Sequence, residues 1–125
     1  MAFPPRLEKE LEELRRQFSI ENGEDASFIN LVFKDFPLGE GFNISQSDIL
    51  LRIPKSYPDA GPDMFWADPN LRLANGQIPQ SADQIESYLD KQWRRFSWHR
   101  QAWNPAIDDM HGHVEFIRKR LKEKK

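Results

Sequence analysis

The sequence predicts an α+β domain in which helices pack on one face of an antiparallel sheet. Apolar residues recur at helical spacing near both ends of the chain, whereas the middle holds strand-like runs broken by prolines and turn residues. The 125 residues, of which 38% are hydrophobic, suit one domain spanning residues 1–125, with residues 118–125 as a basic helix end or tail.

The first element is an amphipathic helix. Its apolar stripe is Leu7, Leu11, Leu14 and Phe18. Pro4 and Pro5 suit a helix start, because proline lacks only an N–H that would be unsatisfied there anyway. We expect the helix to end near Phe18, before the turn sequence Glu21-Asn22-Gly23.

An antiparallel β-meander follows. Residues 27–36 (SFINLVFKDF) and 48–53 (DILLRI) read as strands, and Phe42-Asn43-Ile44 as an extension of one. Residues 64–66 (MFW) predict a short buried strand between prolines, and Asn75-Gly76 predicts a turn.

Two further helices are predicted. Ser81 to Gln84 match a capping box, and Ile85, Leu89 and Trp93 would then share one helix side. In the last helix, Asn104 would be the N-cap and Pro105 the first helical residue. Its apolar stripe is Ile107, Met110, Val114, Ile117 and Leu121.

Composition excludes several classes of function. The chain has no cysteine, so disulfides, thiolate metal sites and thiol catalysis are ruled out. With neither a signal peptide nor an apolar run long enough for a bilayer, we expect a cytoplasmic protein with no membrane partner. The basic end offsets a helix dipole or binds an acidic partner or nucleic acid, of which nucleic acid is the weaker expectation.

An ordered set of short motifs resembles the ubiquitin-conjugating enzymes. Tyr57-Pro58 and Pro62 precede Asp68-Pro69-Asn70, which is followed by Asn75-Gly76 and then by Trp103-Asn104-Pro105-Ala106. That family shows a Tyr-Pro…Pro segment, a His-Pro-Asn tripeptide, an Asn-Gly turn before its cysteine, and a Trp-Ser-Pro-Ala sequence. Here Asp68 replaces the histidine and Pro79 stands where the cysteine is expected, and more residues than usual separate Pro79 from Trp103.

The chain is more similar to a bacterial branch, the prokaryotic ubiquitin-conjugating-like family E, in its Tyr-Pro…Pro-Asp-Met-Phe and Phe-Ser-x-His…Trp-x-Pro stretches. The resemblance implies a ubiquitin-conjugating (UBC)-like fold with an N-terminal helix, a β-meander and a C-terminal helix. It also implies three partners: a ubiquitin-like protein, a ThiF-type activating enzyme and a JAB-type peptidase.

Without a thiol, acyl transfer needs another nucleophile. A serine hydroxyl requires a general base and oxyanion donors. Ser97 and His99 lie two residues apart and would share one face of an extended backbone. We therefore expect Ser97 to accept the acyl group as an oxyester assisted by His99, or His99 to act alone as a base toward a target amine. A structural role for this pair stays open.

Other residues complete the expected site. Ser81 is a second nucleophile candidate, and Asn70, Asp68 and Trp103 would support the oxyanion, the loop or the site wall. His111 and His113 diverge on a helix, so no metal site is predicted. No phosphate-binding loop is present, no cofactor is expected, and adenylation must come from a partner.

Three functional hypotheses follow. The first is a conjugating enzyme that works through oxygen or imidazole. The second is an inactive scaffold that binds the ubiquitin-like protein or its activating enzyme. The third is a nucleic-acid or acidic-partner module that uses Arg94, Arg95, Arg100 and the basic end, with Trp93, Trp98 and Trp103 as stacking groups.

Overall fold

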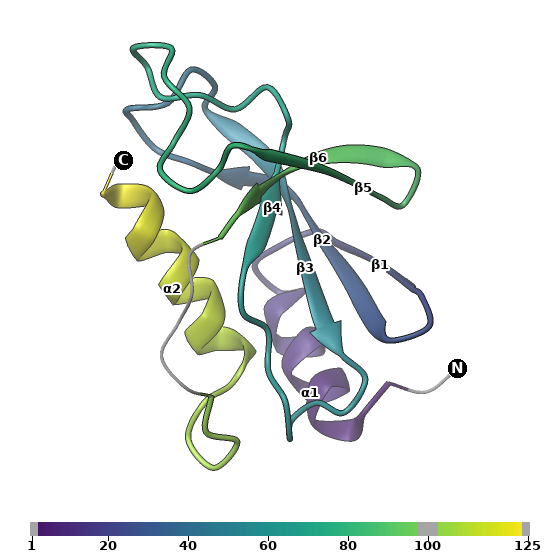
Figure 1. The fold of residues 1–125 in the computed structure, drawn as a ribbon. Coiled ribbons are helices and arrows are strands. Elements are labelled where there is room, and N and C mark those ends of the chain that lie inside the picture. Colours follow the sequence, from purple (N-terminus) through teal and green to yellow (C-terminus); the bar gives the residue numbers. More distant parts are fainter. Residues whose placement is uncertain (1–2, 98–102, 124–125) are drawn as a thin grey trace.

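The computed structural model describes residues 3–97 and 103–123 (Figure 1). The elements in chain order are α1 (Pro5–Leu14), β1 (Ile20–Glu24), β2 (Phe28–Pro37), β3 (Gln46–Pro54), β4 (Phe65–Ala67), β5 (Gln84–Tyr88), β6 (Lys91–Phe96) and α2 (Met110–Lys122). The predicted α+β class is confirmed, as are the first helix, the strands at residues 27–36 and 48–53, and the short strand near Phe65. The first helix ends at Leu14 instead of near Phe18, and the predicted turn at residues 21–23 is wrong, because these residues lie in β1.

The strands form one antiparallel sheet in the order β1-β2-β3-β4-β6-β5. β4 lies between β3 and β6, so the chain from residue 68 to residue 83 leaves the sheet and returns to its far edge. The β5–β6 hairpin crosses the other strands at a steep angle (Figure 1), as the cumulative twist of a sheet allows.

Both helices pack against one face of the sheet. Leu7, Leu11 and Leu14 of α1 are at most 3% exposed and share a core with Val114 and Ile117 of α2. The strand residues of this core include Leu31, Phe33, Ile49, Leu51, Ile53 and Phe96. The period of each apolar stripe thus decides which side of each helix is buried.

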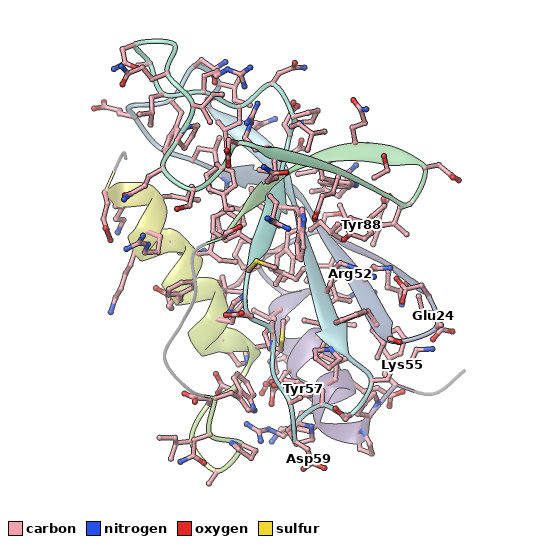
Figure 2. All side chains as sticks on the ribbon, in the orientation of Figure 1. Glu24, Arg52, Lys55, Tyr57, Asp59 and Tyr88 are labelled. Carbon is pink, nitrogen blue, oxygen red and sulfur yellow. The ribbon has the colours of Figure 1, made fainter. Side chains whose placement is uncertain are left out.

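The opposite face of the sheet carries a smaller cluster. Val32, Leu50, Trp66 and Trp93 are buried there, with Met64 and Tyr88 packed against them. Arg52 lies beside the Tyr88 ring (Figure 2), with its guanidinium carbon 4.1 Å from the ring centre. This face is covered by side chains of the β5–β6 hairpin instead of by a helix.

The helix predicted after Ser81 is wrong, because residues 84–96 form the β5–β6 hairpin. Leu89 and Asp90 have φ of 55° and 59° and make a two-residue turn between the strands. A spacing of four residues also keeps side chains on one face of a strand, which explains the misleading pattern. Ile85 pairs with Arg94, whereas Trp93 pairs with Glu86 on the other face.

The last helix begins later than predicted. Asp109, not Asn104, is the N-cap of α2, and its Oδ1 accepts a hydrogen bond of 2.7 Å from the N–H of Gly112. Asn104 instead closes a separate turn, since the N–H of Asp108 donates to the Asn104 carbonyl at 2.8 Å. Ile107 therefore lies outside the helix and is 77% exposed.

A buried carboxylate joins α1, the loop after β3 and the start of α2. Glu10 accepts hydrogen bonds from the Tyr57 hydroxyl, from the Met110 N–H at 2.9 Å and from Arg6 Nε at 2.8 Å. Burial and this carboxylate raise the pKa of Tyr57 well above 10. Tyr57, placed next to α1 in Figure 2, thus fixes the Tyr-Pro segment to both helices.

Candidate functional site

Ser97 directly follows β6, at the end of the hairpin opposite its turn. The N–H of Ser97 donates to the Ser81 carbonyl at 3.0 Å, and its Oγ accepts from Arg95 Nε at 3.0 Å. Arg95 is held in turn by Glu86, with Nη1 2.9 Å from the carboxylate. The structure therefore brings two of the predicted nucleophile candidates, Ser97 and Ser81, together through their backbones.

Ser81 differs from Ser97 in its surroundings. It is exposed and adopts a left-handed φ of 57°, which non-glycine residues rarely occupy. Pro79, in the place expected for the family's cysteine, is buried, and its carbonyl accepts from the N–H of Ala82 at 3.2 Å. The expected cysteine position thus holds a packed residue without a nucleophile.

Arg94 connects this segment with the Asp68-Pro69-Asn70 loop. Its side chain is buried, with the residue 3% exposed, and it donates to the carbonyls of Ala82 and Pro69, the latter at 2.8 Å. Desolvation, with repulsion from Arg72, lowers the pKa of Arg94, and Asp83 opposes this change. One buried guanidinium thereby holds together the two ends of the connection between β4 and β5.

Asp68, Pro69 and Asn70 form a tight turn. The Asp68 carboxylate accepts from the N–H of Asn70 at 2.8 Å, and the N–H of Asp68 donates to Ser47 Oγ at 2.9 Å. Asn43 donates to the Asn70 carbonyl at 3.0 Å. These contacts support the loop, which is one of the two roles predicted for Asp68 and Asn70.

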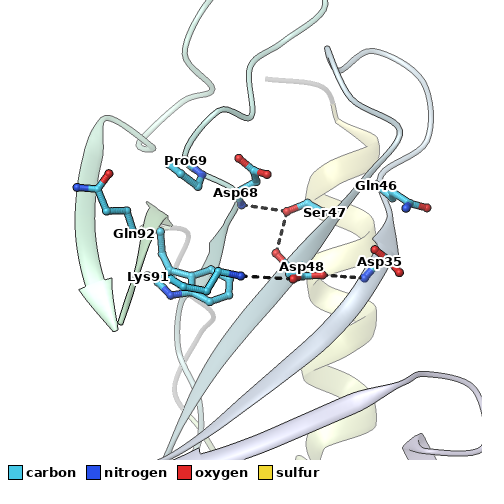
Figure 3. Close-up of a pocket in the computed structure, with 9 residues that line it drawn as sticks. Asp35, Gln46, Ser47, Asp48, Asp68, Pro69, Lys91 and Gln92 are labelled. Atoms are coloured by element: carbon cyan, nitrogen blue, oxygen red, sulfur yellow. Dashed lines mark hydrogen bonds and ion pairs between the residues drawn. The ribbon is translucent and has the colours of Figure 1, made fainter. Parts of the chain in front are cut away.

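A pocket of about 250 Å³ opens beside Asp68 (Figure 3). Its wall includes Asp48, whose carboxylate lies 2.8 Å from Lys34 Nζ and 3.7 Å from Lys91 Nζ. Burial is the largest single effect on Asp48 and opposes its ionisation, but the hydrogen bonds from Lys34 and from the Asp35 N–H, together with the charges of Lys34 and Lys91, lower the pKa of this carboxyl group. The pocket is lined by four charged side chains, of which Asp48 and Lys91 are paired with each other.

Trp103 belongs to a different cluster from Ser97. Its indole N–H donates to the Pro58 carbonyl at 2.7 Å, and its ring centre lies 5.6 Å from that of Tyr57. The Tyr57-Pro58 peptide bond is cis. Trp103 therefore packs on the Tyr-Pro segment, and its role as a wall of the site stays a prediction.

His99, the proposed base, lies outside the described residues, as do Trp98 and Arg100. The stacking platform of the nucleic-acid hypothesis is contradicted at Trp93 and Arg94, which are 2% and 3% exposed. Their burial leaves neither side chain free to contact a nucleic acid.

Sequence reasoning missed the roles of Arg94 and Arg95. Both lie in the run Trp93-Arg94-Arg95-Phe96, where an arginine between aromatic strand residues is a signal of partial burial. Across the described ranges, no three histidine or acidic side chains gather as metal ligands. None of the described helices has the length and hydropathy needed to cross a membrane.

The order of elements defines the class of protein. An N-terminal helix, an antiparallel meander, a proline-rich loop and a C-terminal helix make an α+β protein compatible with the fold of E2 (ubiquitin-conjugating) proteins. The chain belongs to prokaryotic E2 family E, whose family model matches residues 4–124. Neither a curated protein nor a solved structure gave a significant match.

Proposed function

We propose that this chain is the conjugating component of a bacterial ubiquitin-like modification pathway and carries the ubiquitin-like protein as an oxyester on Ser97. Membership of prokaryotic E2 family E supports the pathway. The absence of cysteine requires a different acceptor atom. The observation that carries the choice of Ser97 is the hydrogen bond of 3.0 Å from Arg95 Nε to its Oγ.

The proposed first step is attack of Ser97 Oγ on the activated C-terminal carbonyl of the ubiquitin-like protein. The new C–O bond forms as the bond to the activating group, AMP or an activating-enzyme thiolate, breaks. The hydroxyl proton passes to a base, for which His99 is the candidate. Arg95, already within hydrogen-bond distance of Oγ, supplies a positive charge that favours the oxyanion intermediate.

In the second step a target amine attacks the ester carbonyl. The C–N bond forms, the C–O bond to Ser97 breaks, and Oγ recovers a proton while the amine loses one. Asp68 and Asn70 hold the neighbouring loop, Trp103 forms a wall, and Ser81 is the alternative acceptor. A ThiF-type enzyme would supply the activated carboxyl group, and a JAB-type peptidase would process precursors or conjugates.

A second candidate function is a non-catalytic scaffold for the ubiquitin-like protein or its activating enzyme. A specific observation favours it: within the described part of the chain, the hydrogen-bond partner of Ser97 Oγ is Arg95, which cannot accept a proton. Pro79 is also buried in the place of the nucleophile. Under this hypothesis the fold binds its partners and no ester forms.

The test combines the protein with the activating enzyme and ubiquitin-like protein encoded beside it, and ATP. We expect an adduct that resists thiols and is cleaved by hydroxylamine, with the acyl group located on Ser97 by mass spectrometry. Ser97→Ala should abolish the adduct, whereas the matched control Ser56→Ala, at an exposed serine, should not.

An adduct that persists in Ser97→Ala and maps to Ser81 would move the acceptor to that residue. Binding of the ubiquitin-like protein with no adduct in the unmodified chain would favour the scaffold function.

A further inference from the structure

β5 is an edge strand of the sheet. It pairs with β6 along one side, and no other described strand pairs with it. An edge strand presents unpaired backbone N–H and C=O groups, which an extended peptide can use by adding a further strand.

The turn of the hairpin determines which groups of β5 point outward. Leu89 and Asp90 form a two-residue turn, so the flanking pair Tyr88 and Lys91 exchanges hydrogen bonds. Hydrogen-bonded pairs alternate along an antiparallel ladder. Gln84, Glu86 and Tyr88 therefore face β6, whereas the N–H and C=O groups of Ile85 and Ser87 face away from the sheet. Within the described part of the chain, none of these four groups hydrogen-bonds to another residue.

The two edge strands of the sheet, β1 and β5, differ in how well they are protected from pairing with a further strand. At β1 the side chain of Arg15 donates to the Ile20 carbonyl at 3.4 Å, and α1 side chains line a hollow beside Asn22. β5 (QIESY) has no lysine or proline, the residues that commonly block an edge. Ile85 and Leu89 are 43% and 41% exposed, so apolar contact area flanks the free backbone groups.

We propose that the β5 edge binds the extended C-terminal tail of the ubiquitin-like protein as an added antiparallel strand. The identity of this occupant rests on the proposed function. A tail antiparallel to β5 runs from Leu89 toward Gln84 and leaves the sheet where Ser97 is hydrogen-bonded to Ser81. This direction brings the terminal carbonyl to the candidate nucleophiles, whereas a parallel tail would end at the hairpin turn.

The length of the β5 edge and the charges beside it indicate what kind of tail would bind there. From Ser87 to Ser81 a strand needs about six residues at roughly 3.3 Å each. Asp83 and Asp90 flank β5 as exposed carboxylates, so a neutral or basic tail is favoured over an acidic one. Alternating side chains of the tail would contact Ile85 and Leu89 on one face, and backbone hydrogen bonds would tolerate different sequences.

The test titrates the isotope-labelled protein with a synthetic peptide of about eight residues that copies the C-terminus of the ubiquitin-like protein used in the conjugation assay. Backbone amides of Ile85 and Ser87 should become protected from hydrogen exchange, and cross-strand contacts should report the antiparallel direction. Ser87→Pro removes an outward N–H that the fold does not use and should weaken binding about fivefold. The matched variant Ser87→Thr keeps the N–H and should bind like the unmodified chain.

Three results would overturn the proposal: no binding of the peptide, protection elsewhere on the surface, or equal affinity of Ser87→Pro. Concentration-dependent protection of Ile85 and Ser87 without peptide would instead identify a second copy of the chain as the occupant. Amide protection in the unmodified chain decides the question even if Ser87→Pro perturbs the hairpin.

The tail site and the oxyester can fail independently. Peptide binding at β5 without any ester would refute the oxyester alone. Ester formation that Ser87→Pro leaves unaffected would refute only the tail site.

Discussion

Arg94 Nη2 lies 2.8 Å from the carbonyl oxygen of Pro69, and its Nη1 contacts the carbonyl of Ala82. The first carbonyl belongs to the Asp68-Pro69-Asn70 turn, and the second follows the candidate nucleophile Ser81. A residue inside β6 thus sets the distance between two parts of the candidate site. The contact with Ala82 is buried and the contact with Pro69 is partly buried, so loss of the Arg94 side chain would leave the Ala82 carbonyl without this donor.

We expect Arg94→Met to lower the free energy of unfolding by about 2 kcal/mol, because the buried contact with the Ala82 carbonyl and the partly buried contact with the Pro69 carbonyl are both lost, while a desolvated charge is also removed. Urea unfolding measures the change. The control Arg16→Met removes an exposed arginine of similar size and should alter stability by less than about 0.5 kcal/mol. A similar small effect for both variants would show that Arg94 does not hold the loops.

The two tyrosines should ionise late in the folded protein. Burial raises the pKa of both Tyr57 and Tyr88 above 10, assisted by Glu10 and Glu86 respectively. In a spectroscopic titration of the folded chain, we expect less phenolate absorbance at pH 10 than in the unfolded chain. The same chain in urea should be about half ionised there. Normal titration of either residue in the folded state would contradict its placement.

Asp48 should support the fold except in acid. Its pKa is lowered below 3.8 in the folded state, so its contribution is fully present above pH 3.8 and is lost as pH falls through the folded-state pKa. Asp48→Asn should therefore cost about 1 kcal/mol at pH 7 and progressively less in acid, as pH-dependent unfolding would show. Asp59→Asn, at an exposed loop residue, should show no such trend. A cost that is independent of pH would indicate that the ion pair with Lys34 contributes nothing.

Gly61 should not tolerate a side chain. A Cβ at this position would lie 2.2 Å from Cδ2 of Trp103, far inside the contact distance. Gly61→Ala should therefore displace the indole from Pro58 and destabilise the fold by about 1–3 kcal/mol. Changed tryptophan fluorescence and a lower melting temperature would report this. The neighbouring control Ala60→Ser is exposed and should leave both unchanged.

The sequence by itself determined the elements whose patterns are local. The stripe of Leu7, Leu11 and Leu14 is sufficient to place α1, because its period matches one helix face. The β-branched and aromatic run in β2 likewise identifies a strand. Family membership could also be recognised from motif order, and the absence of cysteine from composition alone.

Only the tertiary structure decided the β5–β6 hairpin and the start of α2. Ile85 and Leu89 have a spacing that suits a helix as well as one face of a strand, and pairing with β4 through β6 selected the strand. Asn104 and Asp109 are both good N-caps, and the contact of the Met110 N–H with Glu10 fixes the later one. At both places the local sequence suits two structures about equally well. Contacts with residues distant in sequence therefore determined which structure forms.

For the candidate site too, the sequence identified the residues and the tertiary structure determined how they are arranged. The sequence supplied Ser97, Ser81 and the Asp68 turn as chemically capable residues. Their arrangement depends on Arg94 and Arg95, whose partners are separated from them by up to 25 residues. A hydrogen bond between distant residues leaves no periodic pattern in the chain, because its geometry exists only after the sheet has brought both segments together.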